Sequence, residues 1–551
     1  MKKRRITTII ITIALVISSA IFVAFKAGND FKLMKSLDIF FAFFKELNLL
    51  YVDDLDPEQL IEAAINGMLS QLDPYTSYIP AEEKKNYRFM TTGEYGGIGS
   101  LIRTSGKYPL ITDIYQGYPA HKAGLRVGDS IISINNNPVV LTNLKEISET
   151  LKGPPGTDIS ITIHRPFPDT IFSLVLRREK ISIKSVSYYG KHENNTGYIR
   201  LDNFTQDAYL EVKEALIMLK QQGITSVILD LRGNPGGLLN EAVEICNIFI
   251  RKNQLIVSTK GKTETLNTKY FTEKDPIDTL IPLAILVNNG SASASEVIAG
   301  AVQDLDRGVV IGERTFGKGL VQSTRNLVYD AQIKVTIAKY YTPSGRCIQI
   351  VDYSKRGKGV IIAADDTARH IFKTRNGRIV KESTGIIPDV EINADEMSRI
   401  CYTLYVKNHI FNFATWYTAL NPSPLKPSDI KFTDSDFNLF LDFIKDKEYD
   451  YITQSEEQLD ELIKRTKNEK YYEKNEPLLN ELKKNIGHDK NKDIENFKPE
   501  IMQVIVEEIA GRYFFHAGTI FVALPKDMQY QKALQVVSDR KTYYSILSVG
   551  Q

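Results

Sequence analysis

Apolar residues recur at three- and four-residue spacing over two stretches near the start of the chain. The first stripe lies within residues 33–47, and the second lies within residues 60–72, after Asp56-Pro57, a pair that suits the cap and first turn of a helix. This pattern predicts two amphipathic helices in an N-terminal helical region over residues 29–88. Their apolar faces pack either within the chain or, since the first stripe is rich in phenylalanine, against a second copy in a homodimer. The sequence leaves both arrangements open.

An uncharged apolar stretch over residues 6–25 follows the basic cluster Lys2-Lys3-Arg4-Arg5. A helix of that length, at about 1.5 Å per residue, spans roughly 30 Å and can cross a bilayer. Basic residues favour the cytoplasmic side. Residues 1–28 are therefore expected to anchor the protein in the inner membrane, with the remainder in the cell envelope outside the cytoplasm. A cleaved signal peptide, which would leave the protein periplasmic, is the alternative.

Strand patterns replace helical ones over residues 89–178. A glycine loop, Tyr95-Gly96-Gly97-Ile98-Gly99, leads into a strand, and a second strand over residues 131–134 follows the run Ala-Gly-Leu-Arg-Val-Gly-Asp at 123–129. The backbone N–H groups of Gly96, Gly97, Ile98 and Gly99 can cradle a peptide carboxylate, while the next strand accepts the peptide at its edge. A β-rich module with short helices is expected.

Strands and helices alternate over residues 179–393. Residues 197–201 alternate as a strand, residues 226–231 and 283–287 read as buried strands, and a helical pattern lies between the first two. Residues 394–551 instead carry dense charge with helical apolar spacing. The expected fold is α/β and multidomain: membrane anchor and helices, β-rich module, α/β core, and a mostly helical C-terminal extension.

Composition limits the classes of function. The 551 residues are 43% hydrophobic and 25% charged, as in folded globular proteins, and suggest several domains. A formal net charge of +2 gives no indication of nucleic acid as a partner. Cys246, Cys347 and Cys401 are widely spaced, and there is no CxxC, HExxH or His/Cys cluster, so neither a disulfide framework, a metal site nor a cofactor is indicated.

The strongest candidate for a catalytic site lies at the junction between the buried strand at 283–287 and the helix that follows it. Three serines, Ser291, Ser293 and Ser295, sit at this junction, where free N–H groups and the helix dipole can stabilise negative charge. No histidine lies between His192 and His370, and the region offers Lys318 as a candidate base, in the setting Phe-Gly-Lys-Gly. To accept a proton near neutral pH, its pKa would have to fall from roughly 10.4 to about 7 or 8.

An extended segment after Gly319 would place Lys318, Leu320 and Gln322 on one face, so that Gln322 can hold the amine. A Ser/Lys dyad is one interpretation of these residues. The other is a small-residue turn that caps a core helix, with Lys318 a solvated surface charge.

Several motifs together resemble the carboxyl-terminal processing, or tail-specific, proteases, a family of Ser/Lys endopeptidases. They are Gly-Ser-Ala-Ser-Ala-Ser-Glu at 290–296, Gln303-Asp304 and Gly-Lys-Gly-Leu-Val-Gln at 317–322. The module at 89–178 resembles a PDZ domain, mainly through its Ala-Gly-Leu-x-x-Gly-Asp run. The resemblance covers about residues 30–393 and leaves the extension unexplained.

The resemblance implies roles residue by residue. Ser293 corresponds to the nucleophile, Lys318 to the base and Gln322 to the partner of the lysine. The oxyanion hole would take backbone N–H groups from Ala294 and from Gly236, with Gly237 as the alternative. Asp304 is a family position with a supporting role that the sequence does not define.

Two functions from different classes follow. The first is an envelope endopeptidase that takes the exposed or unfolded C-termini of proteins in its PDZ domain and cleaves peptide bonds through an acyl-enzyme. The second is a membrane-tethered PDZ scaffold that binds C-terminal tails and is catalytically silent. The intact set of serine, lysine and glutamine favours the enzyme.

Overall fold

The computed structural model describes residues 30–84, 89, 91–139, 143–353, 362–363, 370–487 and 489–548. The chain divides into two compact units, whose described residues run from 30 to 78 and from 79 to 548. The anchor expected at residues 6–25 lies outside the described residues. Within the described ranges, no helix combines the length and the apolar character needed to cross a bilayer.

The first unit contains the two helices that the apolar stripes predict. One covers residues 30–50, and α2 covers Pro57–Leu69. The carboxylate of Asp56 caps α2 by accepting the N–H groups of Glu58 and Gln59 at 2.9 and 3.4 Å. The local sequence therefore sets where this helix begins.

The apolar stripe of the first helix stays largely exposed. Phe40 and Phe41 are 37% and 67% exposed, and Leu33 and Leu37 are 60% and 42% exposed. Packing within the described part of the chain therefore leaves most of this face uncovered.

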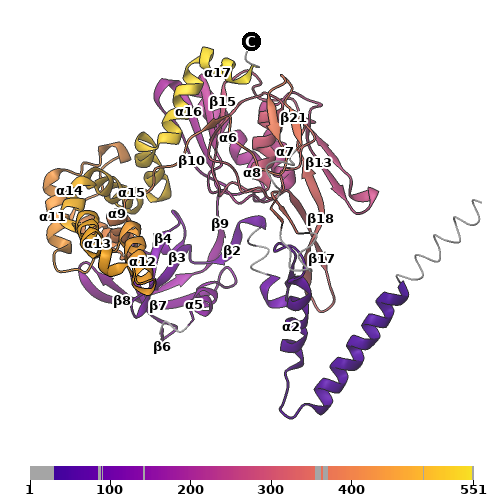
Figure 1. Cartoon of the computed structure of the whole chain (residues 1–551), viewed down its shortest axis with the longest axis horizontal. Helices are drawn as coiled ribbons and strands as arrows, with labels where there is room; N and C mark the ends of the chain where they lie inside the picture. The colour runs from indigo at the N-terminus through magenta and orange to yellow at the C-terminus, as the bar shows by residue number, and fades with distance from the viewer. Residues whose placement is uncertain are drawn as a thin grey trace, which may run out of the picture. The chain divides into compact units, whose positions relative to one another are not determined.

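The β-rich module lies between strands β2 and β9, which pair in antiparallel register and hold its two ends together (Figure 1). Its main sheet has the order β3-β4-β5-β7-β8, with β6 paired to β5. Asn135 and Asn136 both have positive φ, as a tight turn between β5 and β6 requires. The bounds are β2 Glu94–Gly97, β3 Ser100–Ser105, β4 Tyr108–Ile114, α4 Pro119–Lys122, β5 Ser130–Ile134, β6 Asn137–Pro138, α5 Leu144–Leu151, β7 Asp158–Pro166, β8 Asp169–Arg177 and β9 Glu179–Ser182.

The α/β core is built on a sheet with the order β10-β11-β12-β15-β16-β23. Neighbouring strands are parallel except for β10, which runs antiparallel to β11. Every residue of β12 and β15 is buried, which explains their continuous apolar runs. The bounds are β10 Val186–Lys191, β11 Thr196–Leu201, α6 Ala208–Gln221, β12 Ser226–Asp230, α7 Leu239–Phe249, β15 Leu283–Val287, α8 Ala294–Asp304, β16 Val309–Gly312 and β23 Val390–Glu391.

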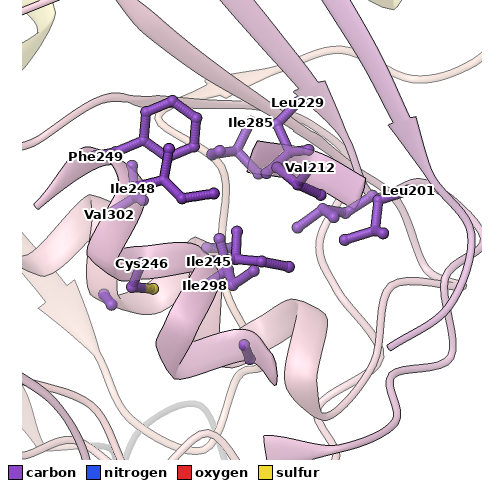
Figure 2. Packing of buried hydrophobic residues seen from close by; sticks show 14 of the residues in the cluster. Leu201, Val212, Leu229, Ile245, Cys246, Ile248, Phe249, Ile285, Ile298 and Val302 are labelled. Carbon is purple, nitrogen blue, oxygen red and sulfur yellow. The ribbon is translucent and has the colours of Figure 1, made fainter. Parts of the chain in front are cut away.

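One face of this sheet is covered by α6, α7 and α8. Figure 2 shows Leu229 and Ile285 of the sheet packed near Ile248 and Phe249 of α7. Because side chains alternate across a strand, the intervening residues Ile228, Ala284 and Leu286 point to the other face and belong to a second cluster.

The end of the chain covers that second face. Helices α16 Met528–Ser538 and α17 Arg540–Leu547 pack there, with Leu534, Val537 and Tyr543 buried against the sheet (Figure 1). The phenol oxygen of Tyr543 also accepts the N–H of Leu283 at 3.0 Å. The last two helices, which the sequence suggested were part of an extension, thus complete the α/β core.

A second sheet carries the strands that follow the lysine motif. Strand β17 pairs with β18, which in turn pairs with β13, and β13 pairs with β14. The bounds are β13 Leu255–Gly261, β14 Lys269–Phe271, β17 Leu320–Asn326 and β18 Gln332–Tyr341. Shorter elements are β1 Ser77–Ile79, β19 Val351–Asp352, β20 Ile362–Ala363, β21 Ile371–Lys373 and β22 Ile379–Lys381.

A helical region precedes α16, as the apolar spacing predicts. Phe437, Phe440 and Ile444 recur at three- and four-residue spacing on α11 and are fully buried in its core. The bounds are α9 Arg399–Val406, α10 His409–Leu420, α11 Asp434–Ile444, α12 Gln454–Asn468, α13 Tyr472–Ile486, α14 Lys490–Asn496 and α15 Lys498–Ala523. The prediction of a multidomain α/β chain with a helical C-terminal part is therefore confirmed.

Candidate active site

Ser293 lies where β15 passes into α8, as predicted. It is the residue before the first turn of α8, and its φ of 55° and ψ of −110° are unusual for a residue with a Cβ. Such a conformation costs on the order of 1–3 kcal/mol and persists only when the surroundings hold it. The residue is 6% exposed and lines a cavity of about 540 Å³. A strained serine in a cavity at a helix N-terminus has the geometry of a nucleophile.

The two flanking serines have structural partners. The hydroxyl of Ser291 donates to the Leu231 carbonyl at 2.8 Å, and that of Ser295 donates to the Asn234 carbonyl at 2.9 Å. Both serines are completely buried. Of the three, Ser293 is the one on the cavity wall.

Lys318 and Gln322 line the same cavity as Ser293. The Nε2 of Gln322 donates to the Leu320 carbonyl at 3.2 Å and to Thr336 Oγ1 at 3.3 Å. The Oε1 of Gln322 is therefore the atom that can accept a hydrogen bond from an amine. The structure thus brings together the three side chains that the sequence singled out.

The route by which they meet differs from the prediction. Strand β17 begins only at Leu320, and its pairing with β18 shifts register between Val321 and Gln322. Val321 lines the cavity beside Lys318 and Gln322, whereas Leu320 is buried. Simple alternation of Lys318, Leu320 and Gln322 on one face was therefore wrong, because Lys318 and Gly319 precede the strand and alternation holds only within it.

Backbone from the loop after β12 lies directly against Ser293. A Cβ on Gly236 would sit 2.9 Å from the Cβ of Ser293 and 3.0 Å from the N of Ala294, so only glycine allows this approach. The N–H of Gly236 donates to Asn234 Oδ1 at 2.9 Å, within its own turn. Gly237 packs toward Phe204 instead, where a Cβ would meet the Phe204 carbonyl oxygen at 2.3 Å.

Asn234 ties this loop to the serine loop and was missed in the sequence. Its backbone oxygen accepts the N–H of Ala292 at 3.0 Å as well as the Ser295 hydroxyl, and its Nδ2 donates to the Leu201 carbonyl at 2.8 Å. The residue is completely buried. An Asn in a glycine-rich turn commonly bonds its own backbone two residues on, and that turn signal was available.

Glu296 joins the serine loop to the lysine loop. Its Oε2 accepts the N–H groups of Ser293 at 2.9 Å and Lys318 at 2.8 Å, while its Oε1 accepts Thr315 Oγ1 at 2.6 Å and the N–H of Gly317 at 2.7 Å. Burial raises the pKa of this carboxyl, and the four donors oppose that rise. A glutamate three residues after a capping serine is the signal that could have identified it.

Asp230 fixes the base of the glycine loop. It is completely buried and accepts Arg232 at 2.6 Å, Tyr198 at 2.7 Å and Arg200 at 3.2 Å. Burial raises the pKa of Asp230, but the two guanidinium groups outweigh this effect and hold it below its usual range. Arg232 also pairs at 2.6 Å with Asp527, just before α16, so the end of the chain reaches the active-site loop.

Asp304 is the last residue of α8 and therefore lies at the opposite end of this helix from Ser293. Its carboxylate pairs with Arg346 at 2.8 Å and accepts the N–H of Ser344 at 3.0 Å. Both partners of this ion pair are almost completely buried. Asp304 therefore braces the segment after β18 and takes no part in the lining of the cavity.

The β-rich module has its own groove, of about 280 Å³, between β3 and α5. Of the four residues predicted to bind a peptide there, Ile98 and Gly99 line the groove, together with Leu101 and Leu144. Gly96 and Gly97 instead belong to β2, which pairs with β9. Strand β3 is the end strand of its sheet among the described residues, and this edge, a glycine turn and apolar walls together suit an extended peptide.

A metal has no evident place here. Across the described ranges, no group of three or more His, Cys, Asp or Glu side chains is arranged to hold a metal ion. Cys347, near β18, is partly buried, and burial raises the pKa of its thiol, so it is a weak nucleophile.

Comparison with known families accounts for most of the chain. The family "Peptidase family S41" matches residues 195–353, and "PDZ domain" matches residues 110–165. "Probable PDZ-protease, C-terminal helical domain" matches residues 400–537, and "Activating protease CtpB N-terminal domain" matches residues 29–83. The prediction of a PDZ module within a protease is confirmed.

Relatives agree with these families. The chain is 36% identical over 326 residues to the carboxy-terminal-processing protease of Bartonella bacilliformis. The aligned residues make up 58% of this chain and 74% of that protein. It is 36% identical over 359 residues to a probable CtpA-like serine protease of Staphylococcus aureus, which covers 64% of this chain and 70% of that protein. Among solved structures, the photosystem II D1 C-terminal processing protease is 27% identical, with a TM-score of 0.36, and covers 64% of this chain and 92% of that chain.

The family match lies on the region that carries Ser293 and Lys318, and the identity extends over most of the Bartonella protein. The chain therefore belongs to peptidase family S41 and is a serine-type peptidase of the carboxy-terminal-processing group with a PDZ domain.

Proposed function

We propose that the chain is an endopeptidase in which Ser293 is the nucleophile and Lys318 is the general base. The observation that carries this proposal is the cavity lined by Ser293, at the start of α8, by Lys318, in the loop before β17, and by Gln322, in β17. Lys318 must be neutral to act as a base, and the carbonyl oxygen of Gln322 can accept a hydrogen from its amine and orient it.

The reaction proceeds through an acyl-enzyme. Ser293 Oγ attacks the carbonyl carbon of the scissile bond while its proton passes to Lys318 Nζ. The resulting oxyanion accepts the N–H of Ala294, which lies in the first turn of α8 and has no acceptor within the helix, and an N–H from the loop at Gly236 and Gly237. Lys318 then gives its proton to the departing amine. A water molecule, deprotonated by Lys318, releases the acyl group as a carboxylate and restores the Ser293 hydroxyl.

Either glycine of the loop can supply the second donor in this scheme. The N–H of Gly236 would have to leave Asn234 Oδ1, to which it donates in this structure. The N–H of Gly237 lies on the side of its peptide unit opposite to the Gly236 carbonyl, which accepts the N–H of Phe204 at 3.2 Å. The closer backbone contact of Gly236 with Ser293 and Ala294 favours Gly236.

The PDZ groove serves as the reader of substrate C-termini. Its apolar walls and strand edge suit an extended peptide with an apolar end. Phe89 and Ile183 line both this groove and the catalytic cavity, so the two depressions are neighbours. A protein with an exposed or unfolded C-terminus can then be held by its end while a bond upstream is cut.

The proposal extends to location and assembly. The apolar stretch at residues 6–25 and its basic flank support an inner-membrane anchor with the catalytic part on the periplasmic side. The exposed apolar face of residues 30–50 supports a homodimer through these helices. Light scattering of the wild type and of Phe41→Asp would test the dimer, since a charge on that face should yield monomers.

The decisive experiment compares the C-termini of envelope proteins in cells with the wild type and with Ser293→Ala. We expect a set of proteins to be shortened only with the wild type. In parallel, a fluorophosphonate should label Ser293 of the purified wild type. No labelling and no shortened proteins would instead favour the silent PDZ scaffold.

A further inference from the structure

The charged side chains of the catalytic cavity are all lysines. Among the described residues that line it are Lys184, Lys318 and Lys334, and none of these lining residues is Asp or Glu. Lys318 must be neutral to act as the proposed base, so Lys184 and Lys334 supply the positive charge of the walls. The cavity therefore presents positive charge to a substrate with no carboxylate in its described lining to balance it.

Lys334 lies on the same face of its strand as the residue that holds Gln322. It is two residues from Thr336 on β18, and Thr336 Oγ1 accepts Gln322 Nε2 at 3.3 Å. The pairing with β17 is regular here, from Gln322 opposite Thr336 to Thr324 opposite Lys334. Alternate side chains of a strand point the same way, roughly 7 Å apart. Lys334 is therefore about two residues of extended chain away from the group that orients Lys318.

The two wall lysines differ in their exposure to water. Lys184, in the segment between β9 and β10, is exposed, whereas Lys334 is half-buried. In the part of the chain that the structure describes, no carboxylate lies within ion-pair distance of Lys334. Water and salt screen an exposed charge more strongly than a half-buried one. Lys334 is therefore the stronger site for a negative partner.

We infer that Lys334 selects substrates that carry an acidic side chain within about three residues of the scissile bond. The inference rests on the proposed function, because it names the substrate class of the same site. The carboxylate comes from a side chain rather than from the substrate's C-terminus, since the proposed function places that C-terminus in the PDZ groove.

The preference follows from charge. An Asp or Glu beside Lys334 forms an ion pair in a cavity where water is partly excluded, whereas a neutral residue gains no such attraction and a substrate lysine is repelled. The pair forms on binding and persists in the transition state, so it raises kcat/KM for the acidic substrate. Lys334 is thus a specificity-determining residue that takes no part in bond cleavage.

The alternative is that Lys334 acts only on Lys318, by a repulsion that favours the neutral amine. In that case substitution of Lys334 would move the pH–rate profile and leave the choice of substrate unchanged. The two roles therefore differ in what they predict for a pair of substrates that differ in a single charge.

The experiment first maps the bonds that the wild type cuts in an unfolded protein, by mass spectrometry of the products. We expect Asp and Glu in excess within three residues of these bonds. A peptide around one mapped bond is then made with Glu or with Gln at each of these positions and with one constant C-terminus. The ratio of kcat/KM for the Glu and Gln peptides should be roughly ten at the preferred position, between the small effect of an exposed ion pair and the larger effect of a charged hydrogen bond.

Variants assign this ratio to one side chain. Lys334→Gln should reduce it to about one, Lys334→Arg should retain it, and Lys334→Glu should bring it below one and favour a substrate lysine at the same position. Lys339→Gln is the matched control, since Lys339 is on the same strand but is exposed and outside the cavity lining, and it should keep the ratio of the wild type. A ratio compares two substrates of one protein, so partial unfolding of a variant does not alter it.

Other results would overturn the inference. A wild-type ratio near one at every position, or a Lys334→Gln protein with the ratio of Lys339→Gln, would show that Lys334 does not read the substrate. An unchanged ratio with a shifted pH–rate profile would assign Lys334 to the alternative role. In each of these cases cleavage, and labelling of Ser293 by a fluorophosphonate, would leave the proposed function standing. If the wild type neither cleaves nor labels at Ser293, the proposed function fails, and the role of Lys334 fails with it.

Discussion

The catalytic cavity and the PDZ groove are neighbours that are held in different ways. The cavity takes its walls from segments far apart in the chain, and buried polar groups tie those segments together. Glu296 bonds the serine and lysine loops, and Asn234 bonds the serine and glycine loops. The PDZ groove takes its walls mainly from β3 and α5 and the turns beside them, which rest on an aliphatic core.

The difference reflects what each site must do. Bond cleavage needs atoms fixed to within fractions of an ångström, and hydrogen bonds to a buried carboxylate supply direction as well as energy. Recognition of varied C-termini needs a strand edge and an apolar surface that tolerate different side chains. Substitutions in the cavity should therefore have large effects on kcat, whereas those in the groove should change KM by smaller factors.

The largest effect is expected for Ser293→Ala, which should abolish peptide hydrolysis, since loss of a nucleophile typically costs several powers of ten in kcat. Ser291→Ala and Ser295→Ala should retain much more activity, because these hydroxyls bond to carbonyls of neighbouring loops. Hydrolysis of an unfolded protein by each purified variant is the measurement. Full loss at Ser291 with survival at Ser293 would assign the nucleophile to the wrong serine.

Lys318→Arg should be nearly as inactive as Lys318→Ala, with both reduced by roughly a thousandfold or more, because arginine offers no neutral form to accept a proton. In the wild type the protonated amine cannot act as a base, so activity should rise with pH as the amine loses its proton. A pH–rate profile of kcat tests this direction. An arginine variant with near-normal activity would remove Lys318 as the base.

Glu296→Gln should lower kcat by roughly a hundredfold and also destabilise the fold, because an amide cannot accept all four donors and leaves buried N–H groups unpaired at about 1–3 kcal/mol each. Asp304→Asn is the control on the same helix. It weakens a buried ion pair with Arg346, so we expect a lower melting temperature with normal kcat per folded molecule. Equal kcat losses in the two variants would mean that Glu296 acts only through stability.

How much the sequence could predict depends on whether a feature is set by neighbouring residues or by contacts between distant ones. Ser293 and Lys318 could be singled out as candidates because their motifs are local, and the strand-to-helix junction and the start of α2 at Asp56 could be predicted in the same way. Long-range contacts were not visible. The pairing of Arg232 with Asp527 joins residues almost 300 positions apart, and no local pattern announces it.

The start of β17 shows a second limit. Alternation holds only within a strand, and Lys318 precedes β17, which begins at Leu320, so the face of Lys318 could not be predicted from the alternation of the residues after it. The placement of α16 and α17 on the core sheet was missed for a related reason, since an amphipathic helix reveals that it has an apolar face but not what covers it.

The smallest effect is expected in the PDZ groove. Gly97 lies in β2, and a side chain there would press on the ring of Tyr95, so Gly97→Asp would disturb the strand as well as the groove. Ser148 of α5 lines the groove directly, and Ser148→Glu should raise KM for peptides with a free apolar C-terminus about tenfold, by crowding and by repulsion of the carboxylate. Thr150→Glu, on the same helix but outside the groove lining, should leave KM unchanged.

A C-terminally amidated peptide separates recognition of the carboxylate from general binding. With the wild type, amidation should raise KM by a factor similar to that of Ser148→Glu, and with Ser148→Glu it should add little, because both changes act on the same interaction. Neither change should alter the rate at which a fluorophosphonate labels Ser293, since that reagent does not need the groove. If amidation and Ser148→Glu both leave cleavage unchanged, the groove does not read C-termini, and substrates reach the cavity without it.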